Sequence, residues 1–405
     1  MSVEVLATGS PAPVGGVRLA AAAAGIRYQG RDDLVVMELA PGSTCAAVFT
    51  RNAFCAAPVI VAREHLARTA PRYLLINAGN ANAGTGDDGL RAARDTCKTL
   101  AAASGCALDQ VLPFSTGVIG EDLPTNAFSL AIPAMLADLD AGGWQRAARA
   151  IMTTDTRPKL ASRQVLLGER PVTVTGMAKG AGMICPDMAT MLAFVATDAA
   201  VAAPLLQTML NEAVAPSFNA ISVDGDTSTN DACVLVATGA AGGQLEREDD
   251  AGFSELREAV EQVCMELAHA IIADAEGGTK VVRVLVEGAA STAEARGVAY
   301  TVAHSPLVKT ALFAADPNWG RILAAVGRSG VTDLAIDRVR IWLDEVPVVA
   351  GGGRHPEYRE AAGQAVMDND SFTIRVSLGR GDRTAQVLTS DLSLDYVKIN
   401  AEYRS

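Results

Sequence analysis

Residues 179–192 read KGAGMICPDMATML, a glycine-rich approach that carries one lysine and leads into an apolar run at 191–195. A threonine hydroxyl is a weak nucleophile until a base removes its proton, and the free α-amine of an N-terminal threonine can be that base. The pKa of an α-amine, about 7.7–8.0, suits this role near neutrality. The small Ala189 would let the hydroxyl of Thr190 reach the preceding carbonyl and break the chain there. The alternative is a glycine loop entering a buried strand, with Thr190 as an ordinary β-branched strand residue.

The composition indicates a globular protein with a core of small aliphatic side chains. Hydrophobic residues make up 49% of the 405 residues, charged residues 20% and aromatic residues 4%. This length suggests two or three domains. The formal net charge is −12 and Lys and Arg are scattered, which argues against a nucleic-acid or anionic-membrane surface. One or two local cations could still hold a small anionic substrate.

The sequence predicts a cytoplasmic protein without metal. The N-terminal residues lack the cationic start of a signal peptide, and no apolar run reaches the ~18 residues of a membrane span. Seven scattered cysteines without a Cys-x-x-Cys pair favour reduced thiols over disulfides or zinc. The four histidines are isolated, so we expect no metal site and no cofactor.

The hydrophobic patterns mix strands and helices without a regular βαβ alternation, which predicts an α+β fold in layers. A weak domain boundary is expected at the acidic stretch 248–252. Strands are predicted at 34–39, 44–49, 73–76, 172–176, 191–197, 233–238, 281–286, 338–343 and 372–378. Helices are predicted at 87–103, 128–139, 144–152, 204–215, 255–275 and 305–315.

Three polar segments are candidates for site loops. STGVIG (115–120) can aim the Thr116 hydroxyl and the Gly117 N–H at one point, as an oxyanion hole requires, or can be a plain β-turn. NAGNANAGTG (77–86) could wall a polar pocket with amides or form only a turn. SVDGDTSTND (222–231) resembles a Ca²⁺ loop but lacks the bidentate glutamate, so Asx-turn hydrogen bonds are expected there instead.

Two more segments lie nearer the C-terminus. Glu276 in EGGTK follows a predicted helix, where an acid opposes the helix dipole. That unfavourable position favours a functional role, such as binding an ammonium group, over a solvated surface charge. DPNWGR (316–321) is expected to be a polar turn.

Together these segments closely resemble the ornithine acetyltransferase family of arginine biosynthesis, the bifunctional glutamate N-acetyltransferases and amino-acid acetyltransferases. The matching pieces follow the family's order and are RNAFCAAPV, NAGNANAGTG, STGVIG, TTDT, KGAGMICPDMATML, SVDGDTSTND, EGGTK, DPNWGRI and INAEY. The resemblance implies a layered α/β sandwich like that of N-terminal-nucleophile hydrolases, with different connectivity.

The resemblance further implies a precursor that cleaves itself between Ala189 and Thr190. The products would be an α-chain of residues 1–189 and a β-chain of residues 190–405, associated as an α2β2 heterotetramer. The implied reaction is ping-pong transfer of acetyl from N²-acetylornithine to glutamate through an ester on Thr190. Acetyl-CoA, which some members use as donor, is left open as a co-substrate.

The family's site positions map onto this chain residue by residue. Thr116 and Gly117 match the oxyanion hole. The remaining matches are the substrate-contact positions Thr153, Lys179, Thr190, Glu276, Asn400 and Ser405. Lys179 would face a substrate carboxylate and Glu276 a side-chain ammonium. Departures from the family pattern stand at Cys185, Asp187, Gly278 and Ser405, and none removes a group that the chemistry needs.

Two rival functions remain at this point. A self-processing aminopeptidase or amidase would share the nucleophile and the oxyanion hole but pass the acyl group to water. A non-catalytic ligand-binding protein would never process itself. The complete motif set favours transfer.

Overall fold

The computed structural model describes residues 11–185 and 191–402 of the chain. They form two compact units, each with its own core. The described residues of the first unit fall within 1–180, 187–219 and 226–271, and those of the second within 181–186, 220–225 and 272–405. The expected boundary at 248–252 is wrong, because that acidic stretch leads into a helix whose residues up to 271 belong to the first unit. The predicted division at residues 189 and 190 is a covalent one and stays a prediction.

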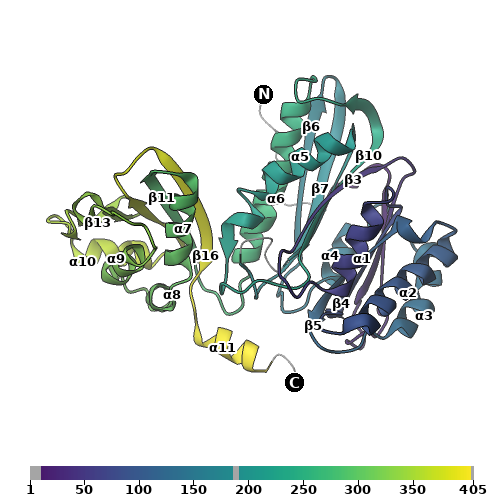
Figure 1. Cartoon of the computed structure of the whole chain (residues 1–405), viewed down its shortest axis with the longest axis horizontal. Coiled ribbons are helices and arrows are strands. Elements are labelled where there is room, and N and C mark those ends of the chain that lie inside the picture. The colour runs from purple at the N-terminus through teal and green to yellow at the C-terminus, as the bar shows by residue number, and fades with distance from the viewer. Residues whose placement is uncertain (1–10, 186–190, 403–405) are drawn as a thin grey trace. The chain divides into compact units, whose positions relative to one another are not determined.

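The first unit begins with a four-stranded sheet in the order β1-β2-β4-β5. Its strands are β1 (Val17–Ala22), β2 (Leu34–Leu39), β4 (Tyr73–Asn80) and β5 (Val111–Val118). The β4–β5 pair is parallel, and the other two pairs are antiparallel. Helices α1 (Ala57–Leu66), α2 (Gly86–Ser104) and α3 (Thr125–Ala137) lie along one face of this sheet (Figure 1).

A five-stranded sheet in the order β3-β10-β8-β7-β6 forms the second layer of this unit. Its strands are β3 (Thr44–Phe49), β6 (Lys159–Leu167), β7 (Arg170–Lys179), β8 (Leu192–Val201) and β10 (Ala232–Leu245). The helices of this part of the unit are α4 (Trp144–Ala150), α5 (Ala203–Val214) and α6 (Phe253–Ile272). A Cβ on Gly176 of β7 would lie 3.0 Å from Val263 and Leu267 of α6, so this helix packs closely on the sheet.

Alternate residues of the central strands fill two separate cores. In β2, Leu34 and Val36 join the core under α2 and α3, whereas Val35 and Met37 join the core between the two sheets. Side chains of successive strand residues point to opposite faces, so a strand buried on both faces has a continuous apolar sequence. The unit therefore has four layers, helix, sheet, sheet and helix.

The second unit is built on a seven-stranded sheet in the order β14-β13-β12-β15-β11-β16-β9. Its strands are β9 (Ile221–Ser222), β11 (Val281–Ala289), β12 (Arg340–Leu343), β13 (Val346–Ala350), β14 (Gly353–Arg354), β15 (Ser371–Ser377) and β16 (Arg383–Ser390). Its helices are α7 (Thr292–Ala303), α8 (Pro306–Phe313), α9 (Trp319–Gly327), α10 (Glu360–Met367) and α11 (Leu394–Ala401). Short 3₁₀ helices span Leu108–Gln110 in the first unit and Ile336–Arg338 in the second, and a third, Phe218–Ala220, has its first two residues in the first unit and its last in the second.

The predicted fold class, α+β in layers, is confirmed. Each predicted strand and helix has a counterpart, although bounds differ by several residues. The prediction of a turn at 115–120 is wrong, because residues 115–118 complete β5. The polar turn expected at 316–321 continues into α9, whose first turn is capped by the Asn318 side chain.

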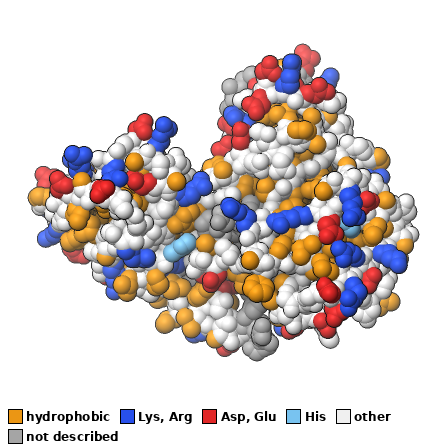
Figure 2. Space-filling view, viewed as in Figure 1, with side chains coloured by type: hydrophobic (Ala, Val, Ile, Leu, Met, Phe, Trp, Pro, Cys, Tyr) orange, Lys and Arg blue, Asp and Glu red, His pale blue; other side chains and the backbone are white. Residues whose placement is uncertain are grey.

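Within the described residues, no helix has the length and apolarity that crossing a membrane requires. Figure 2 shows basic and acidic side chains interspersed over the face that it draws.

Candidate active site

Lys179 is the last residue of β7, and its side chain is buried against the carboxylate of Asp155. Its Nζ lies 3.9 Å from Asp155 Oδ2, and Lys159 Nζ lies 2.6 Å from Oδ1. The same carboxylate accepts hydrogen bonds from the backbone N–H of Gly180 at 2.7 Å and of Thr153 at 3.1 Å. Asp155 therefore brings together two of the predicted substrate-contact residues, Thr153 and Lys179.

The cluster places two lysine ammonium groups beside one buried carboxylate. Burial alone would raise the pKa of Asp155, but the charges of Lys179 and Lys159 and the Gly180 N–H outweigh it and hold the pKa at about 2. Asp155 is thus ionised at neutral pH and offsets the charge of one lysine. A low-dielectric surrounding strengthens charge interactions, so the second ammonium group can attract a substrate carboxylate.

Asp231 lies near Lys179 and is also fully buried. Burial raises the pKa of Asp231 well above its ordinary value, and the Met191 N–H, the Ser228 hydroxyl and the charge of Lys179 oppose this rise. Desolvation penalises the charged form of a carboxyl group. Asp231 is therefore biased toward its neutral form.

Thr116 and Gly117 lie at the carboxyl end of β5, which pairs in parallel with β4. The pairing is irregular here, since Asn80 of β4 faces both Thr116 and Val118. Gly117 has φ +137°, and a Cβ at this position would lie 2.2 Å from the carbonyl carbon of Gly79. No side chain fits between the two strands at this point, so the backbone itself demands glycine.

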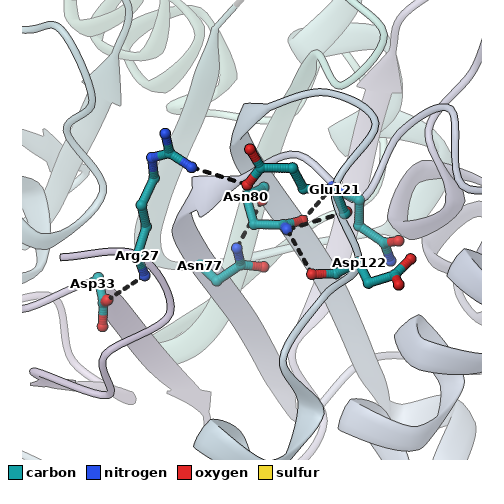
Figure 3. A network of polar contacts seen from close by, with 7 residues as sticks. Arg27, Asp33, Asn77, Asn80, Glu121 and Asp122 are labelled. Carbon is teal, nitrogen blue, oxygen red and sulfur yellow. Dashed lines mark hydrogen bonds and ion pairs between the residues drawn. The ribbon is translucent and has the colours of Figure 1, made fainter. Parts of the chain in front are cut away.

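The buried side-chain amides of Asn77 and Asn80 stabilise the main chain of β4 where its pairing with β5 is irregular (Figure 3). Asn77 Nδ2 donates to the carbonyl of Asn80 at 2.8 Å, and Asn80 Nδ2 donates to the carbonyls of Glu121 and Asp122 at 3.2 and 3.0 Å. The Ser115 hydroxyl donates to Asn77 Oδ1 at 2.6 Å. The asparagines of the predicted polar loop therefore fix the main chain around Thr116 and Gly117 rather than line a turn.

The second unit holds the other predicted pair, Glu276 and Asn400. Asn400 Nδ2, on α11, donates to Glu276 Oε2 at 2.8 Å. The Glu276 backbone N–H donates to the carbonyl of Ala181 at 2.9 Å. A Cβ on Gly182 would lie 2.3 Å from the Glu276 carboxylate, so a glycine there leaves room for that group. The half-buried Glu276 carboxylate is an acceptor suited to an ammonium group.

The acidic residues of the loop at 222–231 bind backbone groups outside the loop. Asp224 accepts from the backbone N–H groups of Met183 and Ile184 at 2.6 and 3.0 Å. Asp231 Oδ1 likewise accepts from the distant Met191 N–H at 2.9 Å. Among the described residues, no group of three or more His, Cys, Asp or Glu side chains is placed to hold a metal ion.

The remaining predicted positions, Ala189, Thr190 and Ser405, lie outside the described residues, as does Asp187. Cys185 is buried, and its Sγ lies 3.8 Å from His304 Nε2.

Sequence reasoning missed the roles of Asp155 and Lys159. Asp155 belongs to the TTDT segment, and Lys159 follows it by four residues. Those positions give no sign that both side chains are buried, because burial follows from the packing of β6 and β7 around them. The acidic residue in TTDT was the only available signal.

Comparison with known proteins gives a match along nearly the whole chain. A family model described as the ArgJ family matches residues 18–405. The chain is 61% identical over 393 residues to the arginine biosynthesis bifunctional protein ArgJ of Methylococcus capsulatus, covering 97% of this chain and 96% of that protein.

Two solved structures are also similar to parts of the chain. One is the arginine biosynthesis bifunctional protein ArgJ from Bacillus halodurans, with 37% identity, 52% of this chain and 98% of that chain covered, and a TM-score of 0.49. The other is an ornithine acetyltransferase from Mycobacterium tuberculosis in complex with ornithine, with 33% identity, 46% of this chain and 98% of that chain covered, and a TM-score of 0.40.

Proposed function

The chain belongs to the ArgJ family, and from this membership we propose that it transfers an acetyl group from N²-acetylornithine to glutamate. The predictions of family and of an acetyltransferase are confirmed at the level of family membership. The observation that carries the proposal is the 61% identity to a bifunctional relative over 97% of the chain. The substrates, the acetyl-Thr190 intermediate and the cleavage between Ala189 and Thr190 are the finer parts of the proposal.

In the proposed maturation, the Thr190 hydroxyl attacks the carbonyl carbon of Ala189. The peptide C–N bond breaks, an ester forms on Oγ, and water then hydrolyses this ester. The products are a carboxylate at Ala189 and a free α-amine at Thr190, which becomes the base for the transfer reaction.

In the proposed transfer, Thr190 Oγ attacks the acetyl carbonyl while the α-amine takes the hydroxyl proton and passes it to the departing ornithine amine. The amine of glutamate then attacks the ester, giving N-acetylglutamate and regenerating the hydroxyl. Thr116 and Gly117 donate hydrogen bonds to the oxyanion in both steps, and each such donor is typically worth about 3 kcal/mol of barrier.

Substrate binding is assigned to the two clusters described above. Lys179, whose ammonium group lies beside Asp155, binds the α-carboxylate, and Thr153 adds a polar contact. Glu276 and Asn400 bind the side-chain ammonium of the ornithine part, and Ser405 is assigned as a further substrate contact.

The five-stranded sheet supports the proposal that both fragments stay together after cleavage. Strands β3, β6 and β7 precede the proposed cut, whereas β8 and β10 follow it. Two ladders of six residue pairs each, β3–β10 and β7–β8, would then join the α-chain to the β-chain. Separating the chains would break both ladders and open the core between the sheets. We further propose an α2β2 assembly in the cytoplasm, with no cofactor and with acetyl-CoA as an alternative donor.

Intact mass and a transfer assay test the proposal together. We expect two fragments with the first ending at Ala189, and acetyl transfer to glutamate that exceeds acetate release. Thr190→Ala should remain one 41.8 kDa chain and be inactive, whereas Thr190→Ser should keep part of the cleavage because the hydroxyl remains. Acetate release at one rate with and without glutamate would refute the transferase and favour a hydrolase. Rates with N-acetylornithine and with acetyl-CoA decide the donor.

A further inference from the structure

Asn230 and Asp231 are consecutive buried residues directly before β10, and each side chain bonds to the backbone of another segment. Asn230 is 6% exposed and Asp231 is 1% exposed. The mechanism above gives neither residue a role. Their bonding partners, however, lie next to the residues that it does use.

The amide of Asn230 holds the main chain directly before the proposed oxyanion hole. Its Nδ2 donates to the carbonyls of Ser115 at 2.9 Å and Ala81 at 2.7 Å. Ser115 immediately precedes Thr116. The Oδ1 atom accepts from the Thr229 hydroxyl at 2.6 Å, so the amide group cannot rotate without losing bonds on both sides.

Asp231 holds the main chain directly after the proposed nucleophile. Its Oδ1 accepts from the backbone N–H of Met191 at 2.9 Å, and the next residue, Ala232, donates its N–H to the Met191 carbonyl at 3.1 Å. Both backbone groups of the residue that follows Thr190 are therefore bound by residues 231 and 232.

Building on the proposed function, we propose that Asn230 and Asp231 are positioning residues that set the separation between the nucleophile and the oxyanion-hole backbone. One side chain fixes the peptide before Thr116, and its neighbour fixes the peptide after Thr190. Consecutive Cα atoms are only about 3.8 Å apart, so this dipeptide is a short and stiff link between the two. Self-cleavage and acetyl transfer both need a hydroxyl and an oxyanion hole held in register.

The free-energy cost of burying the Asp231 carboxyl group supports a role beyond packing. Its Oδ2 is buried and has no hydrogen-bond partner among the described residues. Burial of a carboxyl group is unfavourable, as the raised pKa of Asp231 indicates, and an apolar side chain of similar size would avoid this cost. An apolar side chain could not accept the Met191 N–H, which is the contact that the proposal requires.

The test measures self-cleavage rate, kcat, KM and Tm in the full-length chain. In Asn230→Ala and Asp231→Ala we expect cleavage and kcat to fall by about tenfold or more, because small misplacements of reacting groups slow reactions strongly. The KM for N-acetylornithine should stay within about threefold, since neither residue is assigned to substrate. Asp231→Asn keeps an oxygen acceptor for Met191 and should cleave within about threefold of the wild type.

His65→Ala is the matched control, since buried His65 Nδ1 bonds to the carbonyl of Val111 in the same strand as Ser115, at 2.8 Å. His65→Ala should lower Tm but leave the self-cleavage rate and kcat unchanged. If Asn230→Ala does not fold, Asn230→Asp removes both donors at constant size. Equal kinetics in the Asn230 and His65 variants, or an Asp231→Asn variant as slow as Asp231→Ala, would overturn the proposal. A wild-type chain that neither cleaves nor transfers acetyl would instead refute the proposed function.

Discussion

A methyl group added at Gly117 is expected to disrupt the proposed oxyanion hole by pushing β4 and β5 apart. The new Cβ would lie 2.2 Å from the Gly79 carbonyl carbon and 2.5 Å from both the Gly79 oxygen and the Asn80 nitrogen, all backbone atoms. The shortest of these distances is more than 1 Å below ordinary van der Waals contact, which begins near 3.4 Å. The strands must therefore separate, because the three atoms that the new Cβ meets first belong to the backbone and not to a flexible side chain that could move aside.

The loss of folding stability expected for Gly117→Ala is the sum of two free-energy costs. Backbone strain of a non-glycine residue at positive φ costs about 1–3 kcal/mol, and overpacking adds about 1–3 kcal/mol. Gly120→Ala is the matched control, since Gly120 has φ +84° and nothing within 4 Å of an added Cβ. Gly120→Ala should therefore show only the cost of backbone strain.

The assay compares Tm, self-cleavage and kcat in Gly117→Ala and Gly120→Ala. Displacement of the hole by about 1 Å can cost about 100-fold in rate, so Gly117→Ala should lose both cleavage and transfer, whereas Gly120→Ala should keep most of each. Equal Tm values and equal rates in the two variants would refute the reasoning, since they would show that the close approach of β4 and β5 has no consequence.

Three further predictions concern charged side chains. Asp155→Asn leaves Lys159 and Lys179 without their buried carboxylate and should lower the free energy of unfolding by about 3–5 kcal/mol, measured by denaturant titration. In the wild type, the lowered pKa of Asp155, about 2 instead of 3.8, predicts stability that is complete above about pH 4 and lost as the pH falls toward 2, with a smaller acid loss in Asp155→Asn. Burial lowers the pKa of Lys309 from 10.5 to about 8 despite the charges of Asp391 and Asp224, so stability should rise between pH 8 and 10.5, and Lys309→Met should abolish that rise. Glu276→Gln should raise the KM for N-acetylornithine about tenfold or more while kcat changes less, and an unchanged KM would remove Glu276 from the ammonium site.

Elements with strong local patterns could be predicted from the sequence. The largely apolar run at 281–286 predicts a strand, and β11 confirms the strand but not burial on both faces. Val282, Val284 and Val286 lie in the core, whereas Arg283 between them is exposed. The helix predicted at 255–275 corresponds to α6. The sequence also contains a signal for the start of α7, because Ser291 and Glu294 have the spacing of a capping box. The Ser291 hydroxyl oxygen accepts from the Glu294 N–H, and the Glu294 carboxylate accepts from the Ala290 N–H at 3.0 Å.

Other features required partners that are distant in sequence. The segment at 115–120 has the Thr-Gly composition of a turn, yet residues 115–118 are the end of a strand that pairs in parallel with β4. Local propensity cannot predict such pairing, since its hydrogen bonds come from another strand. The acidic residues Asp224 and Asp231 have the spacing of a local turn, but they bind backbone N–H groups about 40 positions away in the chain.

The sequence by itself determined the family and the acetyltransferase class, because these depend on residue types in a fixed order, and it is the source of the proposal that Thr190 is the nucleophile. Only the tertiary structure decided which side chains and backbone groups lie together in one buried environment. It placed Lys159, Lys179 and Thr153 around Asp155, and it bound the peptides beside Thr116 and Thr190 to one buried Asn-Asp pair. The physical reason is that burial, charge balance and hydrogen-bond pairing arise between segments far apart in the chain, where no local pattern records them.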